Sequence, residues 1–214
     1  MTRILYGFPL SGNTHRVRLF LSLLGLDYRE QKVNLMIGEH RHPEFLALNP
    51  LGQVPVLVDG EVVLRDSHAI VHYLARTYDR ADVWLPREPA AEARVLQWLF
   101  MDANELHNGL GLARNHLAFG VACDLVGAQA RARAALRVLE QRLTGERWLE
   151  SGRPTLADVA CYPLVRLADQ AGLPLSESPG IAAWLTRAEA LPGFVRMPAW
   201  TSATPGQRQV TSAL

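Results

Sequence analysis

The sequence predicts two parts of different structural class, an α/β part at the N-terminus and an all-helical part after it. Strand-like and helix-like patterns alternate over residues 1–78, whereas no strand signal follows residue 64. The segment 79–89 carries two prolines and alternating charges, as linkers do. We therefore expect an α/β domain at 1–78, a linker at 79–88 and a helical domain at 89–214.

The N-terminal part reads as strand–helix–strand, then helix–hairpin–helix. An apolar run at 4–8 precedes a turn and a helix, whose apolar positions follow the helical spacing: Val17, Phe20, Leu21 and Leu24. A weaker strand at 28–33 and a helical turn at 43–48 come next. Asp59-Gly60 separates two apolar runs, which predicts a hairpin with a type I′ turn. Asp66-Ser67 then opens a helix with this apolar stripe: Ile70, Val71, Leu74 and Tyr78.

The second part shows helical patterns only, at about 89–118, 124–144, 155–170 and 180–190. Its clearest helix start is Thr155, a good N-cap residue, with Asp158 three positions later to bond back to the cap amide. We interpret this pair as a folding signal without chemistry.

Composition excludes several function classes. The 214 residues include 22 Lys+Arg and 21 Asp+Glu, so there is no basic stripe for nucleic acid.

Cys123 and Cys161 lie far apart and form no metal-binding pattern; we expect both in helices of a protein from a reducing compartment. The N-terminus lacks a signal-peptide pattern, and the densest apolar run, 19–26, is too short to span a bilayer. We expect a soluble, cytoplasmic protein with no membrane partner.

Four segments, in this order and at these spacings, resemble the soluble glutathione transferase family: SGNTHRVRL (11–19), GEHRHPEFLALNPLGQVPVL (38–57), LRDSHAIVHYLA (64–75) and TLADV (155–159). The Ser-Gly-Asn opening and ANELHNG (103–109) are most similar to bacterial, serine-using, theta- or zeta-like members. The resemblance implies a thioredoxin-like N-terminal domain, glutathione as co-substrate, no metal, a hydrophobic electrophile bound between the domains, and a homodimer. It also implies a transferase of the kind that serves in detoxification.

Glutathione carries two carboxylates, an amine, a peptide backbone and a thiol, and each needs a partner. The resemblance implies that a cis Val54-Pro55 bond exposes the Val54 backbone to pair with the cysteinyl part, although Pro55 could simply start a strand. Asp66 and Ser67 at a helix N-terminus suit the γ-glutamyl amine and carboxylate. The alternative is that either residue is only the helix N-cap.

Ser11 is the expected catalytic residue, by resemblance to the serine that donates a hydrogen bond to the glutathione sulfur. One donor to a charged acceptor contributes about 1.5–3 kcal/mol, comparable with the ~2.7 kcal/mol that a two-unit pKa shift requires. Asn13 and Thr14 are alternates for this role, and Ser11 could be only a turn residue. We interpret Tyr6, within the first strand, as a packing residue.

His40 and Gln53 match family positions near the glycine end of glutathione, where Arg41 could also donate. The second substrate is expected against the helix that starts near residue 89. Candidate lining residues there are Asn104, His107, Asn108, Arg114 and His116.

Two alternatives to the transferase stay open, a binding protein and an isomerase, and a thiol reductase is not expected. A binding protein of the same fold would carry glutathione or hydrophobic ligands without catalysis. A zeta-like isomerase has Ser-Ser-Cys where this chain has Ser11-Gly12-Asn13. A thiol reductase of this family needs a cysteine at position 11, and this chain has none before Cys123.

Overall fold

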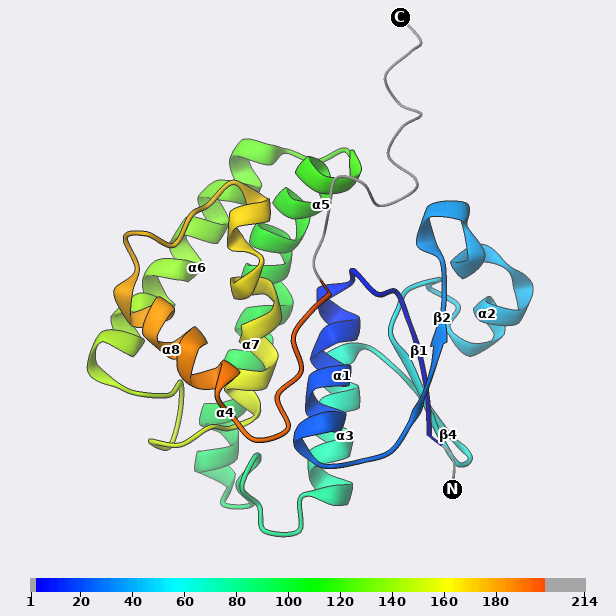
Figure 1. Cartoon of the computed structure of the whole chain (residues 1–214), viewed down its shortest axis with the longest axis horizontal. Coiled ribbons are helices and arrows are strands. Elements are labelled where there is room, and N and C mark those ends of the chain that lie inside the picture. The colour runs from blue at the N-terminus through cyan, green and yellow to red at the C-terminus, as the bar shows by residue number, and fades with distance from the viewer. Residues whose placement is uncertain (1–2, 199–214) are drawn as a thin grey trace, which may run out of the picture.

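The computed structural model describes residues 3–198 of the chain, so the end of the predicted helical domain, 199–214, lies outside the described residues. Figure 1 shows a sheet on one side of the molecule and a group of helices on the other. The strands are β1 (Arg3–Gly7), β2 (Arg29–Lys32), β3 (Val56–Asp59) and β4 (Val62–Arg65), in the order β2-β1-β3-β4. β1 pairs in parallel with β2, while β3 is antiparallel to both β1 and β4. This is the predicted α/β order.

Helices cover both faces of the sheet. α1 (Gly12–Leu23) and α3 (Ser67–Tyr78) lie between the sheet and the helical part, and α2 (Pro43–Leu48) lies on the far face, after the short 3₁₀ turns η1 (Leu35–Ile37) and η2 (Glu39–Arg41). Alternation along the strands explains the two layers, because neighbouring residues point to opposite faces. Leu5 and Leu57 pair in the core beneath α1 and α3, whereas Tyr6 and Val56 pair on the α2 face.

The hairpin forms as predicted, but its turn differs. Asp59 pairs with Val62, so the two central residues are Gly60 and Glu61. Only Gly60 has positive φ, 63°. A type I′ turn needs positive φ at both central positions, so the type I′ prediction is wrong, and positive φ at the first alone matches type II′.

The helical part contains α4 (Pro89–Met101), the π-helical segment η3 (Asp102–Gly111), α5 (Leu112–Phe119), α6 (Leu125–Gly145), α7 (Leu156–Arg166), the 3₁₀ turn η4 (Ala168–Ala171) and α8 (Pro179–Glu189). The predicted helix at 89–118 is therefore three consecutive segments. Gly109 lets α6 approach η3 closely, since a Cβ there would lie 2.7 Å from the Ala132 nitrogen. No helix among residues 3–198 is long and apolar enough to cross a membrane.

The prediction for the cysteines is half right. Cys161 is buried in α7, but Cys123 lies in the connection between α5 and α6, where its Sγ contacts the Leu112 carbonyl oxygen at 3.7 Å. The helix had already ended at Gly120, which adopts positive φ.

Asp158 fixes the start of α7, as the Thr155 pattern predicts. Its buried carboxylate accepts four hydrogen bonds: from Thr155 N–H (2.8 Å), Thr155 Oγ1 (3.2 Å), Leu149 N–H (3.1 Å) and Trp184 Nε1 (2.9 Å). Burial nevertheless raises the pKa of Asp158 to about 6. The carboxylate joins α7, α8 and the segment before α7.

Replacing Asp158 with Asn should destabilise the protein by about 3 kcal/mol, because an amide can accept at only one end and two buried donors lose their acceptor. Urea unfolding followed by tryptophan fluorescence measures the change. Asp169→Asn, at an exposed position in η4, is the matched control. An unchanged midpoint in Asp158→Asn would show that the four bonds do not anchor α7.

Candidate active site

Ser11 is the N-cap of α1. Its Oγ accepts a hydrogen bond from the Thr14 N–H at 3.2 Å, as the turn interpretation expects. The side chain is half-buried, and its hydroxyl proton has no acceptor among residues 3–198. The first turn of α1 contains no acid, so the free N–H groups of the helix face this position without a competing negative charge. Ser11 is thus both a cap and an available donor.

The two alternates to Ser11 lie in different surroundings. Thr14 is fully buried, its Oγ1 accepts from the Phe8 N–H at 3.3 Å, and its methyl group fills the space beside Gly7. Asn13 is half-buried, and its Oδ1 accepts from Nη1 of Arg16 at 2.9 Å. These contacts do not show whether Asn13 or Thr14 takes part in catalysis, so that role stays a prediction.

The Val54-Pro55 peptide bond is cis, as expected. No hydrogen bond between described residues engages the Val54 amide or carbonyl, so this backbone edge is open to a peptide. The neighbouring Gln53 has an exposed side chain, and its carbonyl oxygen accepts from Nδ2 of Asn49 at 2.7 Å.

Asp66 is the N-cap of α3, with φ of 69° and ψ of 121°. Such a positive φ is strained for a residue other than glycine and is typical of functional sites. Oδ1 accepts from the His68 and Ala69 N–H groups at 2.8 and 3.1 Å. The His68 side chain and these amides hold the pKa of Asp66 well below its usual range. The carboxylate is 60% exposed, so it remains ionised and accessible at neutral pH.

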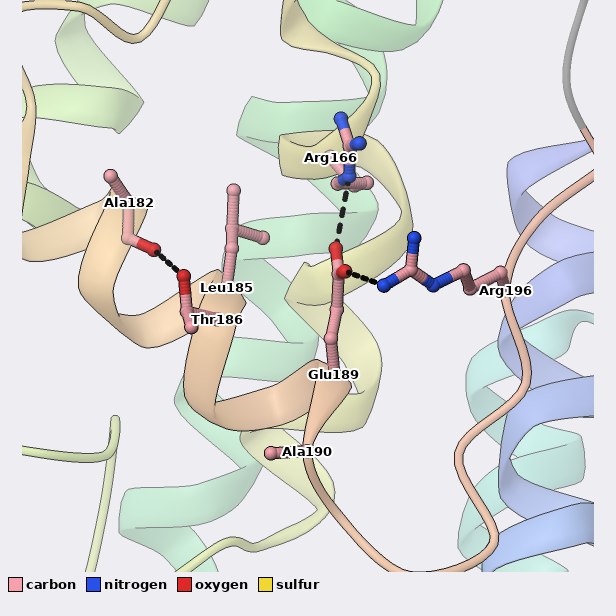
Figure 2. A pocket seen from close by; sticks show the side chains of 7 residues that line it. All are labelled: Arg166, Ala182, Leu185, Thr186, Glu189, Ala190 and Arg196. Carbon is pink, nitrogen blue, oxygen red and sulfur yellow. Dashed lines mark hydrogen bonds and ion pairs between the residues drawn. The ribbon is translucent and has the colours of Figure 1, made fainter.

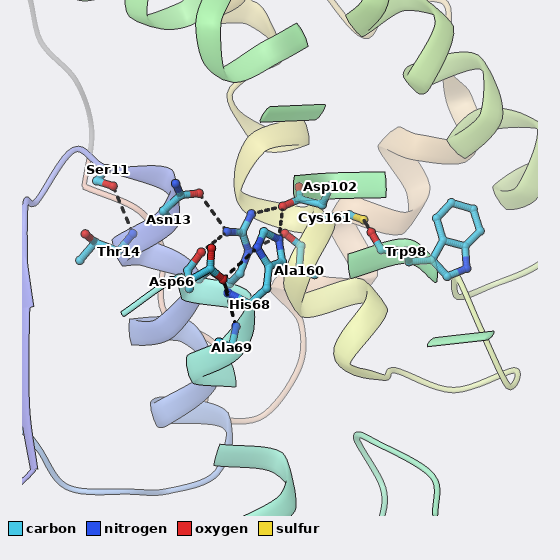
Figure 3. A network of polar contacts seen from close by, with 12 residues as sticks. Ser11, Asn13, Thr14, Asp66, His68, Ala69, Trp98, Asp102, Ala160 and Cys161 are labelled. Carbon is cyan, nitrogen blue, oxygen red and sulfur yellow. Dashed lines mark hydrogen bonds and ion pairs between the residues drawn. The ribbon is translucent and has the colours of Figure 1, made fainter. Parts of the chain in front are cut away.

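Ser67 connects this helix start to a buried charge network that sequence reasoning missed. Figure 3 shows this network, with Asp66, His68 and Asp102 labelled. Arg16 is completely buried, and its Nη1 donates to Ser67 Oγ at 2.6 Å, while Nε donates to the Ala160 carbonyl at 2.9 Å. Its Nη2 pairs with Asp102 Oδ2. His68 Nε2 also lies 2.7 Å from that oxygen.

The network draws on α1, α3, η3 and α7. Arg16 therefore brings Asn13 and Ser67 together and joins both to the helical part. The only sequence signal for the network was the position of Arg16, four residues before Phe20 on the apolar stripe of α1.

His40 lies in η2, half-buried, and its Nδ1 is buried without a hydrogen-bond partner among the described residues. Burial lowers the pKa of His40, so the ring is neutral near pH 7. A Cβ at Gly52 would lie 2.9 Å from the His40 carbonyl oxygen, which places the η2 turn beside Gln53.

The candidates for the second substrate divide into two groups. Asn104, His107 and Asn108 all lie on the π-helical segment η3, where Asn108 Nδ2 donates to Asn104 Oδ1 at 3.2 Å. Burial lowers the pKa of His107, and Asp102 opposes that shift, so His107 lies within electrostatic range of the Arg16 network. Arg114 and His116 lie further along on α5, where Arg114 bonds to Gln170 in η4 and His116 Nδ1 lies 3.0 Å from the Val121 carbonyl oxygen in the following connection.

Two further findings concern other possible sites. Among residues 3–198, no group of three or more His, Cys, Asp or Glu side chains is placed to hold a metal ion. A depression of about 490 Å³ lies on α7 and α8, where Glu189 pairs with both Arg166 and Arg196 (Figure 2). It contains none of the predicted site residues.

Tyr6 packs edge-on against Phe45, at 6.4 Å between ring centroids, in line with the packing interpretation.

Removing the charge of Asp102 should destabilise the protein by about 3–5 kcal/mol, since Arg16 would remain buried without a counter-ion. Urea unfolding of Asp102→Asn measures this loss. The double variant Arg16→Met with Asp102→Leu should recover much of it, because both charges are then gone. Equal loss in the double variant would show that the hydrogen bonds of Arg16, rather than its charge, stabilise the fold.

Comparison with known proteins now adds to this geometry. The family model of the glutathione S-transferase N-terminal domain matches residues 1–76, and that of the C-terminal domain matches residues 82–187. The chain is 35% identical over 201 residues to glutathione S-transferase 3 of Zea mays, covering 89% of this chain and 90% of that protein. It is 36% identical over 200 residues to maleylacetoacetate isomerase of Pseudomonas aeruginosa, covering 89% and 92%.

A solved structure of a glutathione transferase homologue from Drosophila mojavensis, with bound glutathione, superimposes with a TM-score of 0.81 at 29% identity. The superposition covers 89% of each chain.

Proposed function

Since this chain belongs to the glutathione S-transferase family, we propose that Ser11 stabilises the thiolate of bound glutathione, which the enzyme adds to an apolar electrophile. The observation that carries the proposal is the free hydroxyl proton of Ser11 at the N-terminus of α1. A free thiol has a pKa of about 8.5 and is only a few per cent ionised at pH 7. The hydroxyl donor contributes about 1.5–3 kcal/mol to thiolate stability, and the helix N-terminus adds roughly 0.3–1 kcal/mol.

The remaining parts of glutathione would bind near the starts of α1 and α3. The open Val54 backbone pairs with the cysteinyl unit. The Ser67 hydroxyl accepts from Arg16 and keeps its own proton for the γ-glutamyl carboxylate, while the ionised Asp66 accepts from the adjacent amine. His40 and Gln53, which lie on neighbouring turns, would bind the glycine carboxylate.

The electrophile would bind against η3, near Asn104, His107 and Asn108. These residues lie on the segment that also supplies Asp102 to the Arg16 network. A π-helical segment is rare in proteins and often marks a functional site, which supports a substrate surface here.

A second candidate function is a glutathione-dependent isomerase. The similarity to the Pseudomonas aeruginosa isomerase supports it. The residues Ser11-Gly12-Asn13 argue for the transferase, because this chain lacks the Ser-Ser-Cys motif of the zeta-like isomerases. A carrier without catalysis would bind glutathione and leave its thiol pKa unchanged, so the same titration separates it from the enzyme.

We also propose a cytoplasmic homodimer. Phe100 on α4 is 68% exposed and is the one aromatic among the exposed large apolar side chains of residues 3–198. Leu51, 57% exposed, and Val62 and Val63 on the edge strand β4 add further apolar surface. Exposed apolar side chains indicate a protein–protein contact where they form a contiguous patch, and we propose that these residues do so in the dimer.

Ser11→Ala should raise the pKa of bound glutathione by about one unit or more toward the free value, and lower activity at pH 7 by about 10-fold. The thiolate ultraviolet absorbance, titrated against pH with saturating glutathione, measures the shift. Ser11→Thr keeps the hydroxyl and should retain a lowered pKa, and Ser176→Ala is an exposed control. Urea unfolding separates the effect from the loss of the helix cap, which costs about 1 kcal/mol. An unshifted pKa in wild type would refute thiolate activation.

Phe100→Glu should convert the protein to a monomer, because a buried unpaired charge opposes association. Sedimentation equilibrium should give twice the chain mass of 23.7 kDa for wild type and the single mass for the variant. Val126→Glu, at a 79% exposed apolar position on α6, serves as the matched control and should stay dimeric. A monomeric wild type contradicts the homodimer.

A further inference from the structure

Arg114 on α5 carries a buried positive charge that no described residue neutralises. The residue is only 4% exposed. Its Nε donates to the neutral amide oxygen of Gln170 at 2.7 Å, and its Nη2 is buried with no hydrogen-bond partner among residues 3–198. Burial lowers the pKa of Arg114 to about 10, and no neighbouring charge opposes that effect. Arg16 is equally buried, but it has Asp102 as counter-ion and hydrogen bonds on all three nitrogens.

An unpaired buried charge is unfavourable for folding. Taking a cation out of water costs several kcal/mol, and an apolar side chain of similar volume is often more stable at such a position. Within the fold, the guanidinium has the Gln170 amide oxygen and the face of the Phe119 ring as partners, and neither carries a negative charge. A bound anion would satisfy both the charge and the free Nη2.

The position of Arg114 connects it to the catalytic end of α1. Gln170 lies in η4, and its N–H bonds to the carbonyl of Leu167 at 3.0 Å. The Leu167 side chain lies against Gly12, where an added Cβ would be 3.6 Å from its Cδ1. Gly12 follows Ser11 directly, so three successive contacts connect Arg114 to the residue next to the one expected to hold the thiolate.

The guanidinium lies over an aromatic ring. Its Cζ is 5.1 Å from the centroid of the Phe119 ring, a cation–π contact. Because Gln170 occupies the Nε side, the two Nη groups form the remaining edge. That edge matches the two oxygens of a carboxylate.

On the basis of the transferase function proposed above, we propose that Arg114 binds a carboxylate on the second substrate. The acceptors of this enzyme are then apolar electrophiles that carry an acid group. Arg114 orients the acceptor through this group and takes no part in the chemical step.

Two matched acceptors test the proposal, a chlorodinitrobenzoate and the corresponding chlorodinitrobenzamide. In both, the glutathione sulfur forms a bond to the ring carbon and chloride leaves. Rates are divided by those of free glutathione, so that only the effect of the protein remains. Wild type should favour the carboxylate, and Arg114→Met should lower the carboxylate-to-amide ratio of kcat/KM by ~10- to 100-fold, as expected for a lost charge-assisted bond. Arg133→Met, an exposed arginine on α6, should leave the ratio unchanged.

A second variant tests the same site without removing the arginine. Gln170→Glu supplies an internal carboxylate to Arg114, so it should abolish the preference for the acid and raise the urea midpoint. Arg114→Met should also keep or raise that midpoint, whereas an arginine needed for folding would lower it. A lower midpoint with an unchanged acceptor ratio would overturn the proposal.

Binding of unreactive dinitrobenzoate, measured by calorimetry against dinitrobenzamide, separates this inference from the transferase function. If wild type turns over neither acceptor, the proposed function fails; dinitrobenzoate binding that is lost in Arg114→Met would still establish the carboxylate site. Equal affinity for the acid and the amide in wild type, or acid binding retained in Arg114→Met, overturns it.

Discussion

Arg16 lies where α1 meets α3, η3 and α7, and its guanidinium holds these four elements together. It is completely buried, so each of its hydrogen bonds must be made within the protein. Asp102 supplies the counter-ion from the helical part, and the Ala160 carbonyl fixes the Nε side. The Arg16–Asp102 pair adds a buried charged contact between the α/β part and the helical part to the packing of α1 against α7.

The same guanidinium determines the geometry of the candidate site. Through Ser67 it fixes the start of α3, and through Asn13 it fixes the first turn of α1. Two helix N-termini therefore face one region, where a thiolate and a carboxylate would both be favoured. The only acid at these helix starts is the N-cap Asp66, which has positive φ and an exposed carboxylate.

Local patterns predicted most of the fold, since caps, turns and periodic apolar residues act within a few positions. The hairpin, the α3 start and the Asp158 cap are of this kind. What the patterns missed depends on long-range contact: Asp102 meets Arg16 across 86 positions. No residue pattern distinguishes the π-helical bonding of η3 from α-helical bonding. Cys123 lies outside a helix because α5 ends before it. Family resemblance, rather than pattern, pointed to Ser11 and to the cis bond before Pro55.

The π-helical segment η3 is a place where the number of residues in this helix can change during evolution. A π segment holds more residues per turn than an α-helix, so deleting one residue from η3 lets it relax toward α-helical bonding without breaking the helix. Because both kinds of turn complete about one rotation, α5 keeps its orientation after such a deletion, whereas one residue removed from a regular α-helix rotates everything that follows by about 100°. Arg114 on α5 would stay with Gln170, and Asp102 at the start of η3 would stay with Arg16. The segment η3 can thus gain or lose a residue, and change the side chains that it carries, without moving the elements on either side of it.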